Sequence, residues 1–350
     1  MDKLLKDLLE APGVSGYEEN IAAVISAELE KYCDSVETDS FGNVIGKIGC
    51  GGKKIMLATH MDEVGMVVKY INDKGYIYFV KVGGISDGVL LGQRVKILTK
   101  NGAVTGIIGT KPPHLMNDAE RAKNVPHTDM FIDIGLASRD EVLKTVEIGD
   151  QIIFEENAGV LNGDFYFGKA VDNRLGCWVL IKTAEQLSSL KLKDTEIYLV
   201  ATAQEEVGLK GGKTSSFKID PDFALIIDTT VAGDVPGIDE KTACLKLGKG
   251  VAVTMLEASG RGAIVPSKVR KLILEAAREN SIEHQIDIID GGMTDGAIIY
   301  TSRSGVPTGI LSIPTRYLHA PSGVFNIKDA CSAAELSVKV VQKVSSGTII

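Results

Sequence analysis

The stretch Ile55-Met56-Leu57-Ala58-Thr59-His60-Met61-Asp62-Glu63 decides how the fold is interpreted. Its first five residues form a short apolar run, which predicts a buried β-strand over 55–59. Polar side chains follow at once, because His60 and Asp62 come directly after the strand. In open α/β sheets, ligands bind beyond the carboxyl ends of the strands. The stretch therefore predicts both a sheet and the edge of that sheet where a site would lie.

Strands and helices alternate towards both ends of the chain. Apolar runs predict strands over 196–203 and 223–227, and helical periodicity predicts helices over 172–189 and 327–344. Residues 15–18 have capping-box spacing, which predicts that another helix begins there. Such alternation is typical of an α/β domain.

The middle of the chain has a different pattern. Short β-rich segments separated by turn residues recur from about residue 67 to residue 161, and only 138–145 has a helical pattern. This even spacing predicts a small all-β barrel or sandwich. We therefore expect an α/β domain made of residues 1–66 and 162–350, interrupted by an inserted β-rich domain of residues 67–161.

The composition limits the classes of function. The 350 residues include 38 basic and 46 acidic side chains, for a formal net charge of −8, which argues against a dedicated nucleic-acid binder. Five cysteines without short spacings predict free thiols in a reducing compartment. The first residues lack the apolar core of a signal peptide, and no run approaches the ~18–20 apolar residues of a membrane span. We expect a cytoplasmic protein without a membrane partner.

Histidines and carboxylates recur at the predicted strand and helix ends. Each alone has a structural explanation, such as an aspartate that caps a helix. Together they are costly to bury unless a cation neutralises them. Imidazole and carboxylate ligands without thiolate suit Zn²⁺, Co²⁺ or Mn²⁺, and two such ions would balance three carboxylates and a hydroxide. The residues concerned are His60, Asp62, Asp172, Glu205, Glu206, Asp228 and His319.

Two spacings predict separate roles within this set. His60 and Asp62 are two strand residues apart and would lie on the same side, where Asp62 could orient the imidazole. Glu205 and Glu206 are adjacent, so an extended backbone would point them to opposite sides, one to bind metal and one to move protons. Adjacent carboxylates are poorly placed to flank one glycosidic bond, which argues against a glycosidase.

Five motifs, in order, resemble a known enzyme family over essentially the whole chain. That family comprises the dinuclear metallo-aminopeptidases that include the tetrahedral (TET), glutamyl and deblocking aminopeptidases. The motifs are Thr59-His60-Met61-Asp62-Glu63-Val64-Gly65, Ala170-Val171-Asp172-Asn173-Arg174-Leu175-Gly176, Ala203-Gln204-Glu205-Glu206-Val207-Gly208, Ile227-Asp228 and Tyr317-Leu318-His319-Ala320-Pro321.

The resemblance implies a fold and a set of residue roles. The fold would be a phosphorylase/hydrolase-like α/β/α sandwich with an inserted PDZ-like or barrel-like domain. Two divalent ions per subunit, zinc or cobalt with manganese as an alternative, would be bridged by Asp172. Glu205 would be the general base, and Asp62 would hold His60. His60 and Asp228 would complete one metal site, and Glu206 and His319 the other.

The resemblance also implies an activity and an assembly. The chain would remove N-terminal residues from short peptides, as a homo-oligomer that forms a tetrahedral dodecamer built from dimers through residues 67–161. A metal-dependent deacylase or amidohydrolase acting on N-acylated small molecules is the alternative enzyme. An inactive self-assembling shell is the non-enzymatic alternative, and the complete set of site residues counts against it. Residues 291–297 resemble a family segment near the active site that Gly296 interrupts.

Overall fold

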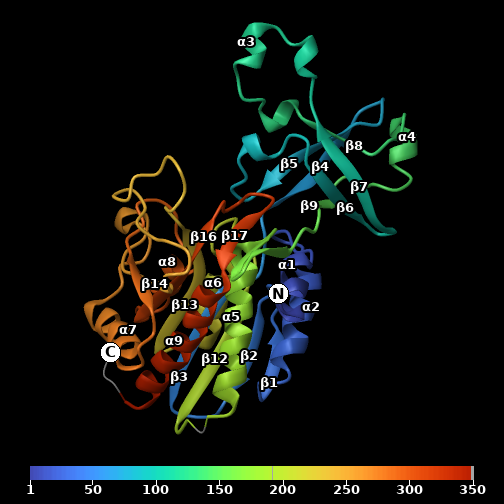
Figure 1. Ribbon diagram of the computed structural model, residues 1–350. Helices are drawn as coiled ribbons and strands as arrows, with labels where there is room; N and C mark the ends of the chain where they lie inside the picture. Colours follow the sequence, from blue (N-terminus) through green and yellow to red (C-terminus); the bar gives the residue numbers. More distant parts are fainter. Residues whose placement is uncertain (191, 348–350) are drawn as a thin grey trace.

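The computed structural model describes residues 1–190 and 192–347, which form an α/β domain and a closed β-barrel (Figure 1). An 11-stranded sheet crosses the α/β domain in the described residues. Its strands are β1 (Ser35–Thr38), β2 (Val44–Ile48), β3 (Lys53–His60), β10 (Gly159–Asn162), β11 (Phe165–Gly168), β12 (Thr195–Thr202), β13 (Phe223–Val231), β14 (Val251–Thr254), β15 (His284–Asp287), β16 (Thr308–Arg316) and β17 (Gly323–Asn326).

The centre of this sheet is parallel and buried. The strands run in the order β1-β2-β12-β3-β13-β16-β17-β11-β10, and β14 pairs with both β15 and β16. The pairs β12–β3, β3–β13 and β13–β16 are parallel. Parallel strands covered on both faces are near-continuous apolar runs, as in the buried residues 55–58. Their carboxyl ends consequently meet at one edge of the sheet.

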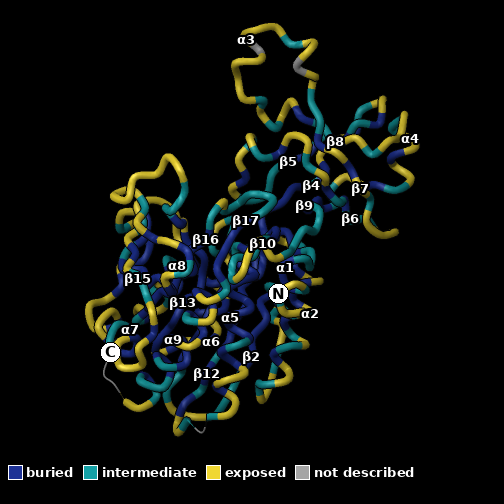
Figure 2. Tube along the Cα trace, viewed as in Figure 1, coloured by how far each residue is buried: buried dark blue, intermediate teal, exposed yellow. Residues whose placement is uncertain are grey.

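Helices cover both faces of the sheet, so the predicted α/β/α sandwich is confirmed. One layer contains α1 (Lys3–Glu10), α2 (Glu19–Leu29), α5 (Val171–Ser188), α7 (Ser267–Glu279) and α9 (Ile327–Ser345), while α6 (Lys210–Ile219) and α8 (Gly296–Ile299) pack together on the other face. Figure 2 shows the sheet buried between these layers. No helix within residues 1–190 and 192–347 combines the length and apolarity needed to cross a bilayer.

The inserted β-rich segment is a closed barrel, as the sequence pattern predicted. Its core is apolar throughout and includes Met66, Val95, Ile97, Ile132 and Ile152. A long connection that holds α3 (Asp118–Arg121) projects from it and is exposed (Figure 2), while the predicted helix 138–145 is only the short α4 (Arg139–Val142). The barrel order is β4 (Gly65–Ile71), β5 (Ile77–Val82), β8 (Phe131–Asp133), β7 (Gly102–Gly109), β6 (Arg94–Thr99) and β9 (Gln151–Phe154).

Candidate active site and metal centre

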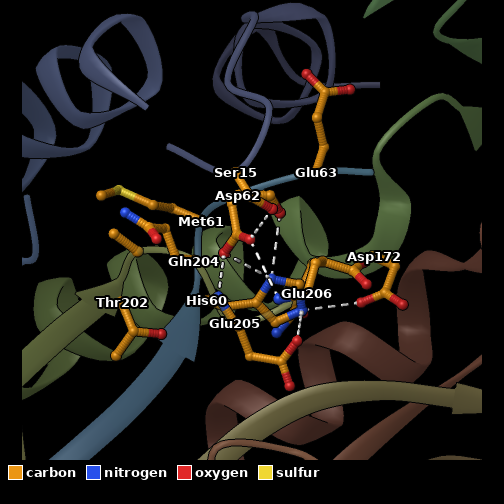
Figure 3. A network of polar contacts seen from close by, with 12 residues as sticks. Ser15, His60, Met61, Asp62, Glu63, Asp172, Thr202, Gln204, Glu205 and Glu206 are labelled. Atoms are coloured by element: carbon orange, nitrogen blue, oxygen red, sulfur yellow. Dashed lines mark hydrogen bonds and ion pairs between the residues drawn. The ribbon is translucent and has the colours of Figure 1, made fainter. Parts of the chain in front are cut away.

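Strand β3 delivers a histidine and an aspartate to the carboxyl edge of the sheet. His60 is its last residue and is 3% exposed, and Asp62 is fully buried. Nδ1 of His60 lies 3.5 Å from Oδ1 of Asp62 and 3.2 Å from its backbone oxygen. Asp62 therefore fixes the ring so that Nε2 faces Asp172 (Figure 3).

Glu205 and Glu206 lie in a tight turn after β12. The strand ends at Thr202, and Gln204 has a left-handed φ of 57°. The backbone N–H of Glu205 donates to Oδ1 of Asp62 at 3.0 Å, and that of Glu206 donates to Oδ2 at 3.2 Å. The prediction of an extended backbone at this pair is wrong, because Asp62 holds the chain in a turn instead.

The turn nevertheless aims the two glutamates at different partners. Oε2 of Glu205 lies 4.0 Å from Nε2 of His60. Oε1 of Glu206 lies 3.3 Å from Nε2 of His319. The two carboxylates therefore face different halves of the cluster, which leaves them free to serve different roles.

Asp172 connects these halves. Its backbone, at φ −80° and ψ 108°, departs from helical angles near the start of α5, and its side chain turns into the cluster instead of capping the helix. Oδ1 lies 3.1 Å from Nε2 of His60, while Oδ2 lies 3.2 Å from Nε2 of His319. Each oxygen thus faces a different imidazole, which is the arrangement expected of a carboxylate that bridges two cations.

Asp228, from β13, and His319, from the loop after β16, complete the cluster. Asp228 lies inside β13, which extends beyond the predicted end at residue 227, and its Oδ1 is 3.6 Å from Nε2 of His60. His319 follows β16, and its Nδ1 lies 3.1 Å from the backbone oxygen of Gly84 in the barrel. A Cβ at Gly84 would come within 2.9 Å of that nitrogen, so this close approach favours glycine.

We call these residues the site cluster: His60, Asp62, Asp172, Glu205, Glu206, Asp228 and His319. Its imidazoles are surrounded by more carboxylates than they can neutralise. Burial alone would lower the pKa of His60, but Glu205 and Asp228 raise it well above its usual value. The neighbouring carboxylates of Asp172 and Glu206 raise the pKa of His319 to about 11. The surroundings therefore strongly favour positive charge at both rings.

The carboxylates respond to the same crowding. Burial raises the pKa of Glu205 well above its usual value, and it also raises the pKa values of Glu206 and Asp228. Burial would do the same to Asp172, but hydrogen bonds from His319 and His60 hold its pKa well below the usual range. The two imidazoles alone do not balance these carboxylates. The carboxylates would therefore have to take up protons unless other cations balance their charge.

The donor atoms fit a divalent cation. His60, Asp172 and Glu206 each offer one ligand atom, and these three atoms lie within 4.8 Å of one another. Oε1 of Glu206 is buried and, although it lies 3.3 Å from Nε2 of His319, no described residue makes a hydrogen bond to it. Buried polar atoms are normally paired, so this oxygen is available to a ligand. Nitrogen and oxygen donors without thiolate suit zinc, cobalt or manganese.

A second group of buried charges lies beside the site cluster, and we call Glu63, Lys169 and Arg174 the Glu63 cluster. Nζ of Lys169 lies 2.8 Å from both carboxylate oxygens of Glu63, and Nη2 of Arg174 lies 3.4 Å from Oε1. Arg174 also donates to the backbone oxygens of Leu8, Ala11 and Met61. In Figure 3 the Glu63 side chain points away from His60 and Asp62. This group binds the end of α1 to the sheet.

Sequence patterns did not reveal the residues that support Asp62. Oγ of Ser15 donates to Oδ2 of Asp62 at 2.6 Å. Oε1 of Glu18 accepts from the N–H groups of Gly16 and Gln204. The predicted capping box is therefore wrong, since the site uses both polar side chains and neither caps α2. The spacing of Ser15 and Glu18 did not indicate that their side chains form hydrogen bonds at the site.

Comparisons with known proteins assign the chain to a family. A sequence profile of the M42 glutamyl aminopeptidases matches residues 42–336. A relative from Acetivibrio thermocellus is 41% identical over 341 residues, which span 97% of this chain and 98% of the relative. All the motifs of the site cluster lie within the matched residues.

Solved structures show the same fold. A TET aminopeptidase from a marine-sediment thaumarchaeon has a TM-score of 0.94 at 36% identity, covering 99% of both chains. The TET1 peptidase of Pyrococcus horikoshii, described as able to assemble into a tetrahedron or a large octahedral shell, has a TM-score of 0.88 at 33% identity and covers 97% of this chain and 98% of its own. The chain belongs to the M42 glutamyl aminopeptidase family and is an aminopeptidase, hence a hydrolase.

Proposed function

We propose that the chain is a metal-dependent aminopeptidase that hydrolyses the N-terminal bond of short peptides with two divalent ions. One observation carries this proposal, namely the two-sided position of Asp172. Its Oδ1 faces His60 and its Oδ2 faces His319. His60 and Asp228 would hold one ion, and Glu206 and His319 the other, with Asp172 shared. Zinc or cobalt suits this donor set, and manganese is the alternative.

The residues of the cluster divide the chemistry between them. Two bound divalent ions would lower the pKa of water and polarise the scissile carbonyl. Glu205 takes the proton of the attacking water, whose oxygen bonds to the carbonyl carbon, and delivers a proton to the amine as the C–N bond breaks. Burial raises the pKa of Glu205, so its carboxylate is a stronger proton acceptor than that of a solvent-exposed glutamate. Asp62 orients His60 and the glutamate turn and touches no reacting atom.

The assembly belongs to the same proposal. We place the catalytic machinery on residues 1–66 and 162–350 and assign residues 67–161 to dimerisation and assembly. The support is the likeness to the Pyrococcus horikoshii peptidase, which can assemble into a tetrahedron or a large octahedral shell. A tetrahedral dodecamer built from dimers would present the cavities to an enclosed space that short peptides can enter. The cytoplasm is the compartment that the sequence predicts.

The test combines metal analysis with activity. Purified protein is analysed for bound metals, chelated and then reloaded with zinc, cobalt or manganese. We expect about two ions per chain, and hydrolysis of aminoacyl p-nitroanilides that chelation abolishes and reloading restores. N-acetyl amino acids are assayed in parallel, because hydrolysis of these alone would identify a deacylase instead. Full activity after complete chelation would refute the metal-dependent mechanism.

A further inference from the structure

We infer that the cavity at the site cluster selects an uncharged, apolar N-terminal residue, which deepens the proposed function and rests on it. The cavity has a volume of about 370 Å³, at the small end of the range for small-molecule sites. Its floor is the site cluster, and its walls come from the barrel, the end of β13 and the loops before α8 and β17.

Apolar side chains dominate the walls. Val89 comes from the barrel side, Val231 from the last position of β13, and Leu318 from the loop that carries His319. Ile289 and Met293 line the remaining wall. Val231 is 55% exposed and Met293 is 49% exposed, although both are apolar. This exposed apolar surface lies next to the polar site cluster, where a substrate side chain would cover it.

The remaining wall residues are polar but uncharged. They are serine and threonine side chains with glycine backbone, namely Ser86, Thr229, Thr230 and Thr294 beside Gly84, Gly291 and Gly292. Among the described residues that line the cavity, every charged or titratable side chain belongs to the site cluster. The walls therefore provide neither a cation for an acidic side chain nor a separate carboxylate for a basic one.

One further carboxylate lies against the wall without reaching the cavity. Glu257 is fully buried, and its Oε1 accepts from both the N–H and the hydroxyl of Thr294. Its Oε2 accepts from the N–H of Ala263. Both oxygens are thus engaged in holding the wall, so Glu257 is not placed to pair with a lysine or arginine side chain of a substrate.

These walls predict how strongly the enzyme discriminates. Covering a leucine or methionine side chain in such a pocket favours it about 10- to 100-fold over a residue without an apolar side chain. A glutamate side chain would lose water without gaining a counter-charge and would face the excess carboxylates of the site cluster. The preference expected here therefore differs from the glutamyl activity in the family's description.

The experiment compares kcat/KM of the full-length, metal-loaded protein for leucyl, methionyl, glutamyl and lysyl p-nitroanilides. Met293→Lys and Val231→Lys each add a cation to the wall, and Ile288→Lys adds the same charge at an exposed neighbouring residue outside the cavity. Inhibition by free leucine and free glutamate is measured as a readout of binding. We expect wild-type kcat/KM for leucyl over glutamyl substrate to exceed about 100-fold.

The lysine variants should shift this ratio towards glutamyl substrate by at least about 10-fold, while Ile288→Lys leaves it unchanged. If the wild-type enzyme prefers the glutamyl or lysyl substrate, the inference is overturned, but the proposed aminopeptidase function is not. An unchanged ratio in both lysine variants overturns the assignment of these walls. If the loaded enzyme hydrolyses none of the four substrates, the proposed function fails and the inference fails with it.

Discussion

Two groups of buried charge lie at the same edge of the sheet, and they are balanced in different ways. In the Glu63 cluster, one carboxylate meets the two cationic side chains of Lys169 and Arg174. Backbone oxygens of Leu8, Ala11 and Met61 accept from Nε and Nη1 of Arg174. This cluster is complete within the chain.

The site cluster has the opposite balance. Five carboxylates crowd around two imidazoles, and Oε1 of Glu206 lacks a hydrogen-bond partner among the described residues. Burying charge costs several kcal/mol per ion unless it is paired, so an acidic cluster of this kind needs cations from outside the chain. Neighbouring motif residues thus have different surroundings, because Arg174 binds backbone oxygens of the fold while Asp172, two positions earlier, faces the imidazoles of His60 and His319.

The largest effect is expected when the shared anion of the site cluster is neutralised. Asp172→Asn should lower metal affinity at least about 100-fold and abolish measurable turnover, because both ions lose a ligand. Metal content after dialysis and peptidase activity measure this. Glu63→Gln is the matched control, since it removes a buried carboxylate from the other cluster and should leave the metal content unchanged. Retention of two ions in Asp172→Asn would refute the bridge.

A smaller loss should follow when proton transfer alone is removed. Glu205→Gln should keep both ions and lower kcat by about 10²–10⁴-fold. Glu206→Gln changes the neighbouring residue in the same turn and should instead release metal, because its Oε1 faces His319. The comparison is made by metal analysis and steady-state kinetics on both variants. Metal loss from Glu205→Gln would make that residue a ligand and overturn its role as base.

The fold was predictable wherever a local pattern matched the environment of the element. The parallel strands β3 and β13 are apolar runs because both of their faces are covered. Helix α6 was missed because Gly211 and Gly212 oppose helix formation. A Cβ at Gly211 would lie 2.4 Å from the backbone oxygen of Ala203, and one at Gly212 would lie 2.4 Å from Oδ1 of Asp295. Close contacts with residues that are distant in sequence require glycine at these two positions, and a local sequence pattern does not reveal such contacts.

The composition of the site was more predictable than its geometry. Histidine and carboxylate at strand ends pointed to the residues of the cluster, because parallel strands bring their carboxyl ends together. The turn at Glu205 was not predictable, since it depends on hydrogen bonds from its backbone to Asp62. The roles of Ser15 and Arg174 were equally hidden, because their partners are distant in sequence.

Disrupting the Glu63 cluster should lower stability whether or not metal is bound. Arg174→Met should lower the free energy of unfolding by about 3–5 kcal/mol, because Glu63 loses a cation and the backbone oxygens of Leu8 and Met61 lose a buried donor. Denaturant unfolding of chelated and metal-loaded protein measures this, and the loss should be equal in both. Arg278→Met removes an exposed arginine and should change stability by less than about 0.5 kcal/mol. A loss confined to the metal-loaded protein would show that Arg174 acts through the ions.

The smallest effect concerns a carboxyl group that a proton neutralises. Burial raises the pKa of Asp295 to about 7, and its Oδ2 lies 2.5 Å from the Thr202 hydroxyl. The folded state therefore holds this proton up to about pH 7 while the unfolded state releases it near pH 4, so stability falls as pH rises between the two. The amide in Asp295→Asn cannot titrate. The free energy of unfolding of this variant, relative to that of wild type, should therefore rise by on the order of 2 kcal/mol between pH 5 and pH 8. Denaturant unfolding of chelated protein measures this, and parallel pH profiles would mean that Asp295 is already ionised at pH 5.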